Sequence, residues 1–188
     1  MKFSTKAITR AALIGVVYYV ATVAIPAISY GVLQFRIGEA LTLLPLVFPE
    51  SVIGLTIGCL LANIFSPFGW ADIVFGSLAT LIAGLLTAII GKKLKLESSD
   101  IKPLPDAPAG AKPKTAKLII KCIIGALPPI LVNAFMLPLV WYLMGFEEVY
   151  WINAALMLAT QSGTILVIGT AIIVALQKAG LLEKSKLY

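Results

Sequence analysis

Six apolar segments are the feature that most restricts how this chain can fold. A helix must run for about 20 largely apolar residues to cross the hydrocarbon core of a bilayer. The chain is 60% hydrophobic and has a mean hydropathy of +0.99, whereas about half of a soluble domain is apolar. This predicts an all-α integral membrane protein, a compact bundle of six transmembrane helices in a single domain, residues 1–188. The expected spans are residues 8–26, 38–49, 51–65, 70–91, 118–144 and 149–178.

Lysine and arginine decide the number of spans. The second and third segments are short and are separated only by Pro49, Glu50 and Ser51, so they could instead form one kinked helix. Of the 15 basic residues, all but Arg36 lie before residue 11, between residues 92 and 121, or after residue 177. Short loops rich in these residues stay in the cytoplasm, and the first two groups share a side only if an even number of spans separates them. Six spans with both termini cytoplasmic satisfy this rule.

Two further segments bear on the organisation of the chain. Basic residues before the first apolar run resemble a signal peptide, but the later apolar segments favour a retained first span. Residues 92–117 are rich in lysine and proline and show no periodicity, so we interpret them as a cytoplasmic linker between four spans and two.

The composition argues against several classes of function. The chain has no histidine, and Cys59 and Cys122 stand alone in apolar runs, which disfavours a metal site, a redox dithiol or any bound cofactor. No phosphate-binding GxxxxGK[ST] motif is present, so we expect neither ATP hydrolysis nor other enzymatic activity. The net charge of +6 flanks hydrophobic spans rather than a soluble face, which argues against nucleic-acid binding.

Polar residues inside apolar segments are the best indication of function, because burial of polar groups in lipid is costly. On the six-span topology most of them gather at the external ends of the spans. Carboxylates, carboxamides and aromatic rings suit the recognition of a planar, donor-rich heterocycle or a small cation rather than bond breaking. The predicted substrate-binding residues are Arg36, Glu39, Asn63, Trp70, Asp72, Asn133, Tyr150 and Gln161.

Each of these residues also has a purely structural interpretation. Trp70 and Tyr150, with Trp141, Tyr142 and Trp151, could form an interfacial aromatic belt. The carboxamides could hold helices together, and Arg36 with Glu39 could clamp a loop.

Small residues recur every four positions in four of the spans and predict close helix contacts. The ladder in the first span, Ala7, Ala11 and Gly15, lies at its cytoplasmic end, so it could face a partner protein instead.

Two stretches, "QFRIGEALTLLP" and "IGCLLANIFSPFGWADIVFGSLATLIAG", closely resemble the QueT family, with Gly38 where that family usually has serine. The resemblance covers nearly the whole chain apart from the linker. It implies the substrate-binding (S) component of an energy-coupling factor (ECF) transporter in the bacterial plasma membrane. It also implies a transmembrane coupling subunit and two cytosolic ATPase subunits as partners, with the coupling subunit contacting Ala7, Ala11 and Gly15.

The implied ligand is a queuosine precursor, a 7-deazaguanine, whose edge presents two adjacent N–H donors. A carboxylate can accept both, so Glu39 or Asp72 would take this pair and the other carboxylate would meet an aminomethyl cation. Arg36 would hold Glu39 ionised. Asn63, Asn133 or Gln161 would donate to the ligand carbonyl, residues 34–36 would act as a lid, and Trp70 or Tyr150 would stack on the ring.

Two other functions compete with this interpretation. A stand-alone secondary transporter could use Asp72 or Glu39 as a proton carrier. A non-transporting scaffold would use the polar residues only to join helices. Within the S-component interpretation, the sequence does not distinguish a deazaguanine from riboflavin, thiamine, biotin or folates.

Overall fold

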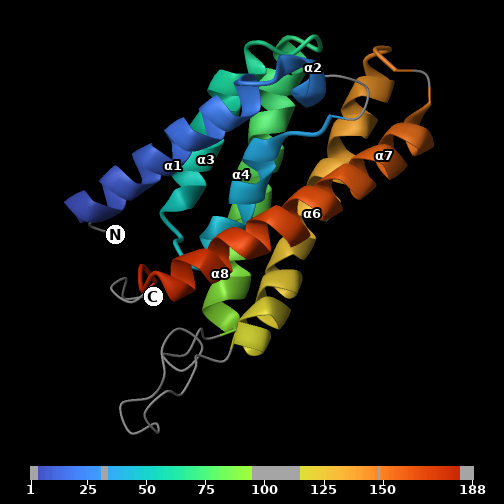
Figure 1. Ribbon diagram of the computed structural model, residues 1–188. Coiled ribbons are helices and arrows are strands. Elements are labelled where there is room, and N and C mark those ends of the chain that lie inside the picture. Colours follow the sequence, from blue (N-terminus) through green and yellow to red (C-terminus); the bar gives the residue numbers. More distant parts are fainter. Residues whose placement is uncertain (1–3, 31–33, 95–114, 148, 183–188) are drawn as a thin grey trace, which may run out of the picture.

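The computed structural model describes residues 4–30, 34–94, 115–147 and 149–182, and every regular element in these ranges is a helix. The bundle of helices is shown in Figure 1. The α-helices are α1 (Thr5–Val23), α2 (Pro26–Ser29), α3 (Ser51–Asn63), α4 (Ser77–Lys93), α6 (Thr115–Leu143), α7 (Tyr150–Ser162) and α8 (Thr170–Lys178). A 3₁₀-helix, η1 (Ile37–Leu46), and two π-helices, η2 (Asp72–Gly76) and η3 (Gly163–Gly169), complete the set.

Four helical stretches are long and apolar enough to cross a membrane, namely Thr5–Val23, Asp72–Lys93, Thr115–Leu143 and Tyr150–Lys178. They coincide closely with four of the six expected spans. The other two expected spans correspond to shorter apolar helices, the ten-residue η1 and the 13-residue α3. At about 2.0 Å and 1.5 Å per residue, each rises only about 20 Å, less than the roughly 30 Å of a hydrocarbon core. Most of the expected linker lies outside the described residues.

Helices α1 and α3 pack closely because small residues meet along their contact. A Cβ atom on Gly15 would lie 2.6 Å from the carbonyl oxygen of Gly54, and one on Gly58 would lie 2.5 Å from that of Gly15. A Cβ atom on Gly54 would collide with the carbonyl oxygen of Ala11. The ladder of the first span therefore meets the ladder of α3 inside the chain, and both backbones approach as small-xxx-small pairs do.

Two clusters of buried apolar side chains fill the bundle. The larger cluster includes Tyr18, Leu43, Ile130 and Ile165, and the smaller one includes Ala79, Ala134, Leu137, Trp141 and Met157. Outside them, large apolar side chains are exposed along the helices, as expected where the surrounding solvent is lipid.

Candidate substrate-binding site

Arg36 lies at the centre of a hydrogen-bond network. Its side chain is buried and only 3% exposed. It precedes η1 in an extended backbone conformation, with φ −98° and ψ 111°, and this directs the side chain toward α3 and η2. Its guanidinium donates to Oδ1 of Asn63 (2.9 Å), Oδ2 of Asp72 (3.2 Å) and Oε1 of Gln34 (3.0 Å). Nε donates to the carbonyl of Ser29 (3.3 Å). Arg36 thus joins the segment before η1 to the ends of two other elements.

Asp72, the first residue of η2, is fully buried and receives three side-chain donors. Its Oδ1 accepts from the indole N–H of Trp141 at 2.7 Å, and its Oδ2 accepts from the hydroxyl of Ser66 at 2.6 Å as well as from Arg36. The carboxamide of Asn63 also donates to the Asp72 carbonyl at 2.8 Å. We call these residues the Arg36–Asp72 network, namely Gln34, Arg36, Asn63, Ser66, Asp72 and Trp141.

The ion-pair partner of Arg36 differs from the expected one. The sequence interpretation paired Arg36 with Glu39, but the salt bridge forms with Asp72. The link between Arg36 and Glu39 is made by the backbone, where the N–H of Glu39 donates to the Arg36 carbonyl at 3.1 Å. Arg36 has an extended backbone before the helix, whereas Glu39 is helical, and the two side chains leave the backbone toward different neighbours.

Glu39 forms a second, smaller network with residues of α1 and α6. Its Oε1 accepts from the hydroxyl of Tyr18 at 2.5 Å, and its Oε2 accepts from the carboxamide of Asn133 at 3.1 Å. All three side chains are buried. This Glu39 network (Tyr18, Glu39 and Asn133) brings together residues that lie more than 100 positions apart in the chain.

Gln161 is buried on α7, and its Oε1 has no hydrogen-bond partner among the described residues. It lies one turn from Met157 in the smaller cluster and one turn from Ile165 in the larger cluster. Asn133 occupies the same kind of position on the neighbouring α6, between Ile130 and Leu137. Both carboxamides therefore lie at the level between the two apolar clusters, and together with Tyr18 and Glu39 we call them the polar layer.

Besides Gln161, two predicted site residues lie outside these networks. Trp70 is 60% exposed and packs near the ring of Phe75, while Tyr150 contacts the rings of Tyr142 and Trp151. These contacts suit an aromatic belt better than a buried site.

The sequence interpretation did not include Tyr18, Ser66 or Trp141 in the site. Trp141 is buried, stacks on Phe68 with ring centroids 4.4 Å apart and donates to Asp72. The sequence feature that could have identified these three residues is an O–H or N–H donor inside or beside an apolar segment, because such a donor needs a partner when it is buried.

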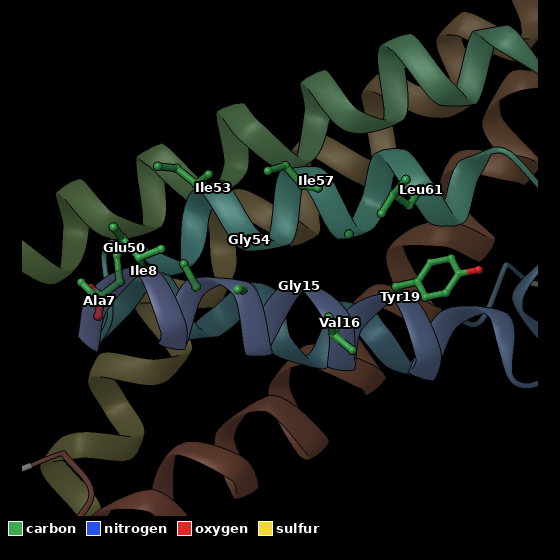
Figure 2. Close-up of a pocket in the computed structure, with 13 residues that line it drawn as sticks. Ala7, Ile8, Gly15, Val16, Tyr19, Glu50, Ile53, Gly54, Ile57 and Leu61 are labelled. Carbon is green, nitrogen blue, oxygen red and sulfur yellow. The ribbon is translucent and has the colours of Figure 1, made fainter. Parts of the chain in front are cut away.

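A hollow of about 390 Å³ lies elsewhere, along the outer side of the α1–α3 pair (Figure 2). Apart from Glu50 its lining is almost entirely apolar, and it includes no residue of either polar network. Its lining residues are Ala7, Ile8, Ala11, Ala12, Gly15, Val16, Tyr19, Glu50, Ile53, Gly54, Ile57, Gly58 and Leu61. The hollow thus contains all three residues predicted to meet a partner, and an ion pair of 2.8 Å from Arg10 to Glu50 lies beside it.

The apolar surface, the long helices and the buried polar layer define a multi-pass α-helical membrane protein. The chain belongs to the QueT transporter family, whose sequence profile matches residues 8–178, and this confirms the resemblance seen in its motifs. It is similar to the queuosine precursor transporter QueT of Lactococcus lactis subsp. cremoris (strain MG1363), with 33% identity over 96 residues. That alignment covers 50% of this chain and 56% of the relative, so the match spans about half of each protein. No solved structure matches the chain.

Proposed function

We propose that the chain is the substrate-binding component of an ECF-type importer and captures a queuosine precursor of the 7-deazaguanine class. The observation that carries this proposal is the buried polar layer, which offers carboxylate, carboxamide and hydroxyl groups inside an apolar bundle. Such groups can recognise the N–H and C=O groups of a planar heterocycle without breaking bonds. The name of the Lactococcus relative points to the same class of solute.

The proposed topology has six spans with both termini in the cytoplasm. In Figure 1 the start of α1, the end of α4, the start of α6 and the end of α8 lie toward the lower left of the view. Lys92, Lys93 and Lys178 occupy two of these helix ends. A common side for the basic ends supports a cytoplasmic location by the positive-inside rule. In this topology η1 and α3 would each cross part of the bilayer and be extended by their flanking residues.

The α1–α3 hollow is the proposed contact for the transmembrane coupling subunit, which in turn would be driven by two cytosolic ATPase subunits. An apolar hollow lined by small residues allows a partner helix to approach closely in lipid. Ala11 also packs against Gly54, so a bulky residue at position 11 would disturb the fold as well as the interface. A test of the interface needs an exposed residue of the hollow instead.

Replacing Ala12 with tryptophan should block assembly with the coupling subunit while leaving ligand binding intact. Ala12 is exposed and lines the hollow, so the indole would fill it without entering the core. Leu13→Trp is the matched control, because Leu13 is 62% exposed on the same helix but does not line the hollow. The measurement is co-purification of the coupling and ATPase subunits from the native membrane. Equal recovery of the subunits with both variants would remove the hollow from the interface.

Transport assays separate this proposal from a stand-alone secondary transporter. The purified chain alone in liposomes should not accumulate a deazaguanine under a proton gradient, whereas the complete complex should do so with ATP. Gradient-driven accumulation by the isolated chain would favour proton coupling through Glu39 or Asp72 instead.

A further inference from the structure

The two buried carboxylates, Asp72 and Glu39, differ in their hydrogen-bond partners. Asp72 accepts from three side chains, one of them the cation Arg36, so its charge is paired and most of its roughly four acceptor positions are filled. Glu39 receives one neutral donor on each oxygen, from Tyr18 and Asn133, and forms no ion pair within the described ranges. Glu39 therefore keeps acceptor capacity on both oxygens, whereas Asp72 has little to offer a ligand.

The donors around the two carboxylates also differ in their freedom to change partner. The Arg36 guanidinium is fixed by four bonds to four residues, and the Trp141 ring is stacked on Phe68. The Tyr18 hydroxyl can rotate about its C–O bond, and the Asn133 carboxamide offers both N–H and C=O groups. The Glu39 network can thus exchange an internal bond for a ligand bond with less disturbance of the fold.

Gln161 adds an unsatisfied acceptor to the same layer. Its Oε1 is buried without a partner in the described structure, and such a buried acceptor costs stability unless it has a use. The π-helix η3 begins two residues later and packs against η1, where a Cβ atom on Gly169 would be 2.7 Å from the Ala40 carbonyl oxygen. Ala40 directly follows Glu39. Each polar set thus adjoins a π-helix, η2 at Asp72 and η3 after Gln161, and π-helical turns are frequent at functional sites.

We propose that Glu39, Asn133 and Gln161 form the hydrogen bonds that recognise the ligand. The Arg36–Asp72 network holds the segment before η1 in place and does not touch the ligand. This inference rests on the proposed function and narrows it. The Glu39 carboxylate accepts two adjacent N–H donors from the edge of a flat heterocycle, such as a ring N–H and a neighbouring exocyclic amine. Gln161 Oε1 accepts a further N–H, and Asn133 donates to a ring acceptor. Asp72 anchors Arg36 and hence the segment before η1.

A comparison of two ligands tests this division of roles. Calorimetry on the purified full-length chain would use 7-cyano-7-deazaguanine and the analogue that lacks the 2-amino group. The wild-type chain should bind the first about tenfold or more tightly than the second, because removal of one donor leaves a buried acceptor unpaired. In Glu39→Gln this ratio should fall toward one. In Asp72→Asn and Trp141→Phe the ratio should stay as in wild type, whatever happens to the absolute affinity.

Gln161→Leu provides an independent measurement on a second helix. It should weaken binding of the amino-bearing ligand about tenfold, while the buried but satisfied Thr164 can be changed to valine with little effect. A ratio that collapses in Asp72→Asn and Trp141→Phe but survives in Glu39→Gln would overturn the inference and leave the proposed function standing. Absence of binding of either compound by wild-type protein would instead overturn the proposed function, and this inference with it.

Discussion

Replacing Arg36 with methionine is expected to destabilise the folded chain by about 3–5 kcal/mol, because the change leaves the fully buried Asp72 carboxylate without its counter-ion. Methionine fills similar space but donates no hydrogen bond, so Asn63 and Gln34 also lose a partner. The measurement is the thermal unfolding midpoint of the purified chain in one detergent. A midpoint close to that of wild type would show that Asp72 is not charged or not buried as described.

Two variants make this prediction specific. The double change Arg36→Met with Asp72→Asn should recover part of the lost stability, because it removes the unpaired charge. Arg10→Met removes the other described ion pair, which is partly exposed, with side-chain exposures of 29% for Arg10 and 13% for Glu50. It should cost about 1 kcal/mol or less. A larger loss from Arg10→Met than from Arg36→Met would contradict the central position given to the buried network.

Gly54→Ala should have the second large effect, although it adds only a methyl group. The added Cβ would collide with the backbone of Ala11, which cannot move unless α1 separates from α3. Overpacking of this kind costs about 1–3 kcal/mol, and contact with backbone places the change toward the upper end. The unfolding midpoint should fall clearly, and the α1–α3 hollow, the proposed contact for the coupling subunit, should lose its shape.

Gly163→Ala is the matched control for the glycine prediction. Gly163 is also helical and is exposed, but nothing lies within 4 Å of a Cβ atom built on it. Alanine there should be neutral or slightly stabilising, because it restricts the unfolded chain without a clash in the fold. Equal destabilisation by both glycine variants would mean that lost flexibility, rather than the α1–α3 contact, explains the result.

The long helices could be predicted from sequence because each apolar segment of 19 residues or more has one stable form in lipid. The 3₁₀ form of Ile37–Leu46 could not, since eight of its ten residues are buried and a segment apolar on every side shows no period. The ladder rule correctly placed small residues at the close contact of α1 with α3. It was wrong for the ladder of the last span, where Ala155, Ala159 and Gly163 are all exposed and nothing lies within 4 Å of a Cβ atom built on Gly163. It did not say that the ladders of α1 and α3 meet each other, because spacing within one helix does not identify the facing helix.

Which polar residues of the candidate site are buried could be predicted from the sequence, but their hydrogen-bond partners could not. Polar atoms in apolar segments pointed to Arg36, Glu39, Asp72 and Asn133, and these do lie in buried networks. The pairing of Arg36 with Asp72 spans 36 positions and depends on how η1 meets α3 and η2, which short-range spacing cannot reveal. The aromatic residues were harder still, because a tryptophan at a helix end suits either a lipid interface or a buried partner.

Binding of a deazaguanine by the isolated chain is the most direct test of the account. Native mass spectrometry of the detergent-purified full-length protein would offer cyano- and aminomethyl-7-deazaguanine together with riboflavin, thiamine, biotin and folate. We predict that one deazaguanine molecule adds to the wild-type chain, that this adduct is much less abundant in Glu39→Gln, and that Leu13→Trp keeps it in full. An adduct with one of the vitamins instead, or a deazaguanine adduct as abundant in Glu39→Gln as in wild type, would contradict the account.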